Sequence, residues 1–225
     1  MYSRIFKAVK NIIPRISDTE LIALRSGTTS LDRQIFQGKV KYPLKKDFTQ
    51  SWELEFKDQQ VNQLLSKYGN EDKLYPNPKF PEILDYLGKN KYFSFIIDQQ
   101  YGGLKMSTES LSNTLTKITS KSPGLGIMTM VPNSLGPGEL LLHYGTEDQK
   151  DKFLPQLSDG QMVPCFGLTG PNNGCDATGS IDQGTLKLKD GKKIVSLDIN
   201  KRYITLAPVA NLIGIAFHLN DPDNL

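Results

Sequence analysis

The chain has 225 residues, of which 38% are hydrophobic, and its 27 Lys and Arg against 24 Asp and Glu give a net charge of +3. So small a charge argues against a nucleic-acid partner, and the two Cys and two His argue against a disulfide framework, a metal site and a Ser-His-Asp triad. Because the sequence has no run of about 20 apolar residues and no signal peptide, we expect a globular cytoplasmic protein.

The first segment, residues 2–16, interleaves apolar and basic side chains at helical spacing. The apolar residues are Ile5, Phe6, Val9, Ile12 and Ile13, and the basic ones are Arg4, Lys7, Lys10 and Arg15. This pattern predicts a basic amphipathic helix. Two interpretations remain open: the helix packs against the rest of its domain, or it makes a peripheral contact with the anionic surface of the inner membrane.

Several further helices are expected before residue 160. An imperfect apolar stripe favours a helix over residues 51–68. Pro81 suits the first position of a second helix, and Ser107 can cap a third.

The end of this helical region carries a capping signal. A short helix over residues 140–144 is followed by Gly145 and by the run Thr146-Glu147-Asp148-Gln149, a capping box that starts the next helix. We expect that helix to end near Pro155. Residues 1–160 are therefore predicted to form an N-terminal helical domain.

Past residue 160 the hydrophobic period changes from helical to extended. The expected strands are residues 163–168, 185–188, 193–199, 203–206 and 212–217. Asp190-Gly191 separates two alternating runs and predicts a tight hairpin. The predicted fold class is α+β: an all-α N-terminal domain followed by an incomplete antiparallel β-domain over residues 161–225.

Two runs in this second part resemble the flavin motifs of the acyl-CoA dehydrogenase family. The residues that fit the first motif are Phe166, Leu168, Thr169, Pro171, Gly174 and Asp176, with Cys175 where the family has Ser. The second motif is matched by Lys201 and Tyr203-Ile204-Thr205. The run over residues 131–141 is similar to that of the large bacterial β-oxidation enzymes of the FadE type, and the resemblance extends over nearly the whole chain.

The resemblance implies FAD as cofactor, a fatty acyl-CoA as substrate and an electron-transferring flavoprotein as electron acceptor. It implies that the backbone at Phe166, Leu168 and Thr169 bonds the pyrimidine edge of the flavin, with Tyr203 beside the ring and Thr205 near N5. Cys175 would lie where the family Ser contacts the acyl-CoA, but a small filler in a tight turn is an equally open interpretation.

The catalytic glutamate of the family belongs to a C-terminal helical bundle that is absent from this sequence, so we assign no catalytic base. Glu139, Glu147 and Asp176 are better explained as residues of helix ends and turns. The missing C-terminal portion or a homo-oligomer is the expected partner. Three functions stay open: a truncated portion of a fatty acyl-CoA dehydrogenase, inactive alone; a non-catalytic remnant or interaction module from an interrupted gene; and a membrane-surface adaptor that uses the basic N-terminal helix.

Overall fold

The computed structural model describes residues 21–22, 25, 32–40, 49–71, 74–134, 136–174, 179 and 182–225. The chain divides into two compact units, Met1–Asp47 and Phe48–Leu225. Within the first unit the structure contains the short helix α3 (Asp32–Phe36), whereas the amphipathic helix expected over residues 2–16 lies outside the described residues. Among the described helices, none is both long enough and apolar enough to cross a membrane.

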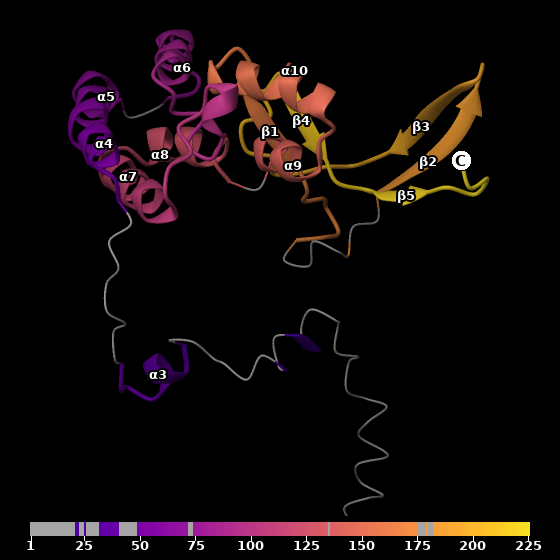
Figure 1. Cartoon of the computed structure of the whole chain (residues 1–225), viewed down its shortest axis with the longest axis horizontal. Helices are drawn as coiled ribbons and strands as arrows, with labels where there is room; N and C mark the ends of the chain where they lie inside the picture. Colours follow the sequence, from indigo (N-terminus) through magenta and orange to yellow (C-terminus); the bar gives the residue numbers. More distant parts are fainter. Residues whose placement is uncertain are drawn as a thin grey trace, which may run out of the picture. The chain divides into compact units, whose positions relative to one another are not determined.

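Helices fill the first two thirds of the second unit (Figure 1). They are α4 (Ser51–Glu55), the π-helical turn η1 (Phe56–Gln60), α5 (Val61–Tyr68), α6 (Phe80–Lys89), the 3-10 turn η2 (Gln99–Tyr101), α7 (Thr108–Lys121), α8 (Pro123–Met130), α9 (Pro137–Tyr144) and α10 (Glu147–Ser158). The continuous run α4–η1–α5 confirms the helix predicted over residues 51–68. The helix predicted from Pro81 is α6, which begins one residue earlier.

The predicted caps are confirmed at α7 and α10. The Ser107 hydroxyl accepts a hydrogen bond from the Ser110 N–H at 3.2 Å. At α10 the Gln149 N–H donates to the Thr146 hydroxyl at 3.3 Å, and the Thr146 N–H donates to the Gln149 side chain at 3.0 Å. These side chains satisfy N–H groups that have no partner within the helix.

The expected end of α10 near Pro155 is wrong, because the helix continues to Ser158. Proline removes one intrahelical hydrogen bond, but the Asp159 N–H donates to the Pro155 carbonyl at 2.9 Å and the helical turn is completed beyond the ring. Leu154 and Leu157, on either side of the proline, are fully buried. Burial of these two side chains offsets the missing bond.

The core of the helical region is built around three aromatic rings. The ring centroids of Phe56 and Tyr92 lie 5.4 Å apart, those of Phe56 and Phe95 lie 5.5 Å apart, and those of Tyr92 and Phe95 lie 5.9 Å apart. All three residues are buried, and burial raises the pKa of the Tyr92 hydroxyl. Tilted and edge-on ring packing of this kind stabilises a core beyond the area it buries.

A buried carboxylate joins the first helix of this region to α7. Glu53 is 1% exposed and accepts hydrogen bonds from the Gln50 N–H at 2.7 Å and the Ser107 N–H at 2.6 Å. Two N–H donors to one carboxylate compensate for its removal from water. The contact fixes the start of α4 against the start of α7.

In the described residues after α10 the structure contains five strands. They are β1 (Pro164–Gly167), β2 (Gln183–Lys189), β3 (Lys192–Asp198), β4 (Leu212–Ile215) and β5 (His218–Asn220). In Figure 1 the β1–β4 pair lies beside α9 and α10, and the β2–β3 hairpin extends away from the helices. The α+β class is confirmed, with one difference from the expected antiparallel domain: among the described strands, β1–β4 and β2–β5 are parallel pairs, and β2–β3 is antiparallel.

The parallel β1–β4 pair has a local anchor. The Asn211 side chain accepts from the Val163 N–H at 2.7 Å and donates to the Gln161 carbonyl at 3.0 Å. The Asn211 N–H also donates to the Val163 carbonyl at 3.1 Å. These bonds bring the start of β4 beside the start of β1 and so fix the parallel register.

The hairpin prediction is confirmed. Asp190 has φ of 51° and Gly191 has φ of 73°. Positive φ at both central residues is typical of the two-residue hairpin turn whose twist matches that of the paired strands. The strand expected over residues 203–206 is wrong: this segment forms turns, with φ of 60° at Tyr203 and 65° at Leu206. Positive φ at both ends breaks the extended conformation, and the Val209 N–H donates to the Leu206 carbonyl within the next turn.

Candidate functional site

The structure brings the two runs that resemble flavin motifs side by side. The first run, residues 166–176, begins in β1 and leaves this strand after Gly167. The second run, residues 201–205, follows β3. The Arg202 N–H donates to the Thr169 carbonyl at 3.0 Å, and the Lys201 ammonium donates to the Leu168 carbonyl at 3.2 Å. Segments more than thirty residues apart in sequence therefore share a direct backbone contact.

The turn after β1 is held by its own hydrogen bonds. The Leu168 N–H donates to the Phe166 carbonyl at 3.1 Å, which closes a three-residue turn. Gly170 and Asn173 exchange backbone bonds of 3.2 and 3.4 Å, and the Asn173 amide donates to the Leu168 carbonyl at 3.3 Å. The turn is thus a fixed structure and not an open loop.

Gly170 lies at a close approach between this turn and the second run. A Cβ at Gly170 would be 2.9 Å from the Asn200 carbonyl oxygen and 2.5 Å from the Asn173 side-chain oxygen. The side chain can move, but the Asn200 carbonyl belongs to the backbone. Glycine therefore permits the two runs to approach each other.

We expect Gly170→Ala to lower the free energy of unfolding by about 1–2 kcal/mol, because the added methyl group overpacks this contact. The matched control is Gly174→Ala in the same turn, where a Cβ would meet nothing within 4 Å. Urea denaturation of the two variants tests this difference. Equal stability of the two alanine variants would contradict the close approach.

The predicted cofactor residues lie around this junction with different exposures. Phe166, Leu168 and Thr169 are half-buried, whereas Tyr203 is 77% exposed and Thr205 is exposed. The Arg202 guanidinium carbon lies 4.7 Å from the centre of the Tyr203 ring. Leu168 and Thr169 accept the Lys201 and Arg202 bonds, and Tyr203 directly follows Arg202. Cys175, the predicted substrate contact, lies outside the described residues.

Thr169 fits a hydrogen-bonding ligand better than its neighbours do. Within the part of the chain that the structure describes, neither its N–H nor its hydroxyl has a hydrogen-bond partner. The Leu168 N–H, by contrast, already donates to Phe166. A half-buried donor and hydroxyl without a protein partner suit the polar edge of a planar ring system.

Cys165 in β1 is a structural residue. It is 1% exposed, and burial raises the pKa of its thiol, so the thiol stays protonated and unreactive near neutral pH. It pairs with Ile213 across the parallel ladder. Its packing therefore supports the strand that leads into the turn.

Sequence reasoning missed a buried ion pair at the junction. The Lys201 ammonium pairs with the Asp182 carboxylate, and the two side chains are 10% and 4% exposed. The second carboxylate oxygen of Asp182 accepts from the Asn200 N–H at 2.7 Å. In the sequence, Lys201 is only a basic residue ahead of the second run, and no local pattern marks Asp182 as its partner.

An apolar cavity of about 240 Å³ lies directly after the second run. It is lined by Leu74, Tyr75, Phe80, Gly124, Ile127, Met128, Leu206, Pro208 and Val209. Leu206 is the residue after Thr205, so the cavity borders the predicted cofactor residues. Its lining comes from segments far apart in sequence, which is why periodicity could not reveal it.

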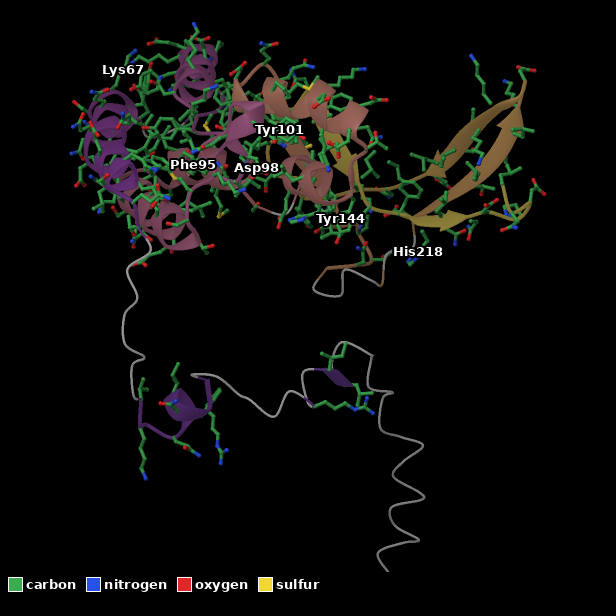
Figure 2. The ribbon with its side chains drawn as sticks, in the orientation of Figure 1. Lys67, Phe95, Asp98, Tyr101, Tyr144 and His218 are labelled. Carbon is green, nitrogen blue, oxygen red and sulfur yellow. The ribbon has the colours of Figure 1, made fainter. Side chains whose placement is uncertain are left out.

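A second apolar hollow of about 340 Å³ lies between the β1–β4 pair and the two helices beside it. Phe166, Ile213 and Leu141 contribute to its lining. Tyr144, which is labelled in Figure 2, lies at the end of α9 and at the edge of this hollow, and its side chain is 82% exposed. The Phe166 side chain therefore faces this hollow.

Comparison with known proteins supports one family. A family model described as Acyl-CoA dehydrogenase, N-terminal domain matches residues 54–161. The acyl-CoA dehydrogenase of Bacillus subtilis (strain 168) is 33% identical over 146 residues, which is 64% of this chain and 37% of that protein. The Caffeyl-CoA reductase-Etf complex subunit CarC of Acetobacterium woodii is 32% identical over 145 residues, 62% of this chain and 36% of that protein.

A solved structure supports the same family. The butyryl-CoA dehydrogenase of Megasphaera elsdenii aligns with a TM-score of 0.59 and 26% identity, covering 76% of this chain and 45% of that chain. The chain thus spans less than half of the length of the relatives that it resembles.

Proposed function

The chain belongs to the acyl-CoA dehydrogenase family, and on that premise we propose that it contributes the helical domain and first flavin contacts of a FAD-dependent fatty acyl-CoA dehydrogenase. The reaction would be the α,β-dehydrogenation of an acyl thioester in β-oxidation. The observation that carries the proposal is the backbone contact between Thr169 and Arg202, which unites the two runs.

The proposed roles follow from the exposure and hydrogen bonding of each residue. The free N–H and hydroxyl of Thr169 would bond the polar edge of the flavin, while the exposed Tyr203 ring and Thr205 would lie against its ring system. Leu168 and Phe166 would position this edge through their turn. Bound FAD would supply the hydride acceptor, because none of the side chains named for the site can accept a hydride.

The apolar cavity after Thr205 supports an acyl substrate. Its lining offers aliphatic and aromatic side chains, which favour the burial of an alkyl group over a polar one. The relative from Acetobacterium woodii carries the name caffeyl-CoA reductase, which points to an aryl thioester as the competing substrate class. Comparing flavin reduction by a fatty acyl-CoA and by an arylpropionyl-CoA, in the assembly that also supplies the catalytic base, would distinguish the two classes.

The name of the same relative places it in a complex with Etf, and this supports an electron-transferring flavoprotein as the proposed electron acceptor. The catalytic base and the remaining flavin contacts would come from outside these residues, either from a C-terminal portion or from a second chain. On this proposal the 225 residues alone bind the cofactor but do not turn over substrate.

FAD binding tests the proposal. We expect the chain to quench flavin fluorescence on titration, and Thr169→Val to weaken FAD binding about tenfold through the loss of one hydrogen bond. Thr169→Ser keeps the hydroxyl and is the matched control, with binding close to that of the unchanged chain. If the unchanged chain leaves flavin fluorescence constant, or if Val and Ser variants bind equally, the assigned role of Thr169 is wrong.

A non-catalytic interaction module is the second candidate, and one observation favours it. The β3–β2–β5 sheet exposes an apolar face: Leu188 is 58% exposed, Leu219 is 55% exposed, and Val195 and Leu197 are each 43% exposed. Apolar faces of this kind mark surfaces that pack against another segment or chain. A chain that is folded and abundant, but free of flavin, would favour this alternative.

A further inference from the structure

The ion pair between Lys201 and Asp182 is almost completely removed from water. The side chains are 10% and 4% exposed, and each makes a further hydrogen bond: Lys201 to the Leu168 carbonyl at 3.2 Å, and Asp182 from the Asn200 N–H at 2.7 Å. The other described ion pairs of the chain all have at least one partner that is more than a third exposed. This pair is therefore distinct in its burial among the described residues.

The pair connects three separate segments. Asp182 immediately precedes β2, Lys201 lies in the loop after β3, and the Leu168 carbonyl lies just beyond β1. The lysine stem also crosses the backbone of the first run, because a Cβ at Gly167 would be 3.5 Å from the Lys201 Cγ. One ammonium group thereby ties the base of the hairpin to the turn that contains Thr169.

Net stabilisation does not account for this arrangement. Burial of two charges costs about as much free energy as their attraction returns, so a buried ion pair adds little stability compared with a neutral pair of similar shape. What the pair does provide is geometry, because its bonds fix the position of the Leu168 carbonyl relative to Asn200 and Arg202.

We propose that Lys201, held by Asp182, is a positioning residue that sets the spacing between the two flavin-contacting runs. It keeps the Arg202 N–H on the Thr169 carbonyl and so presents Thr169 and Tyr203 to one ligand. The inference rests on the proposed function, since it concerns the same site. Lys201 acts through the backbone of Leu168 and needs no contact with the cofactor.

The double variant Lys201→Met/Asp182→Asn tests this role. It removes both charges together, so no uncompensated charge stays buried, and the asparagine oxygen can still accept from the Asn200 N–H. We expect its melting temperature to stay close to that of the unchanged chain, while FAD binding weakens about tenfold or more because the runs lose their spacing. Lys187→Met, at an exposed lysine of β2, is the matched control and should bind FAD as the unchanged chain does.

Hydrogen exchange gives a readout that does not depend on FAD. In the double variant the Arg202 amide should exchange about tenfold faster or more, while the amides of β2 and β3 keep their protection. Lys201→Arg retains the charge and the donor, and should keep the slow exchange at Arg202. If the double variant does not fold, Asp182→Asn alone replaces it, because it removes the charge that holds Lys201 while the asparagine oxygen can still accept from the Asn200 N–H; exchange at Arg202 should again be faster, and unchanged exchange would overturn the inference.

Unchanged exchange at Arg202 in the double variant would overturn the inference, as would FAD binding within about threefold of the unchanged chain. The two proposals fail in different ways. If the unchanged chain binds no FAD, the proposed function fails, and the exchange of Arg202 still decides whether Lys201 sets the spacing of the runs.

Discussion

Asn133→Ala is expected to lower the free energy of unfolding by about 3–4 kcal/mol, the largest loss of stability that we predict for this chain. The Asn133 side chain is 5% exposed and makes three hydrogen bonds to backbone groups. Its oxygen accepts from the Phe95 N–H at 2.6 Å, and its amide donates to the carbonyls of Tyr92 and Thr129 at 2.6 and 2.8 Å.

The size of this loss follows from what the alanine leaves behind. The Phe95 N–H and the Tyr92 carbonyl would lose these bonds inside a core from which water is excluded, and a buried polar group without a partner costs about 1–3 kcal/mol. Figure 2 shows Phe95 within the helical region, away from the exposed strands. The same bonds hold the end of α8, which lines the apolar cavity beside the second run.

Chemical denaturation measures the effect, with Ser134→Ala as the matched control. Ser134 is the next residue along the chain and is exposed, so its loss should change the free energy of unfolding by less than about 0.5 kcal/mol. An Asn133→Ala variant that loses less than about 1 kcal/mol would show that other groups satisfy the Phe95 and Tyr92 backbone.

Gly160→Ala is the second large prediction, with an expected loss of about 3 kcal/mol. Gly160 has φ of 73°, and a Cβ there would be 2.2 Å from the Cα of Gly88. The ends of α6 and α10 therefore cross with their backbones in contact. A methyl group at Gly160 adds steric overlap with the Gly88 backbone to the cost of the left-handed conformation.

Gly191→Ala separates these two contributions. Gly191 also has φ of 73°, but a Cβ there would meet nothing within 4 Å. Its substitution should cost only the conformational part, about 1–2 kcal/mol. Similar losses at Gly160 and Gly191 in thermal denaturation would contradict the close crossing of α6 and α10.

The features that could be predicted from the sequence are those whose cause lies within a few residues. The capping box at Thr146 and Gln149 requires only two side chains three positions apart, and the turn at Asp190-Gly191 requires only residues that tolerate positive φ. Both were predicted at the right positions. The resemblance to flavin motifs could also be found from sequence, because each of the two runs is a short continuous stretch.

The features that could not be predicted depend on partners elsewhere in the chain. Helix α8 has apolar residues on all sides and so lacks the periodic pattern of an amphipathic helix. The passage of α10 through Pro155 depends on the burial of Leu154 and Leu157. The turns over residues 203–206 replace a predicted strand because Tyr203 and Leu206 take positive φ, which alternating hydrophobicity does not signal.

The candidate site likewise combines features with a local cause and features that depend on distant parts of the chain. Thr169, Tyr203 and Thr205 were named from sequence, but their neighbourhood was not: the Lys201–Asp182 pair and the cavity after Thr205 arise only when β1, the hairpin and α8 come together. The roles of the named residues toward a cofactor stay predictions until FAD binding is measured.

A native mass spectrum of the protein purified from the cells that make it tests whether this chain carries flavin. We expect one FAD bound for each copy, on the 25.1 kDa chain itself or on an assembly that contains it. A folded 25.1 kDa chain that carries no flavin, alone or in any complex, would contradict it.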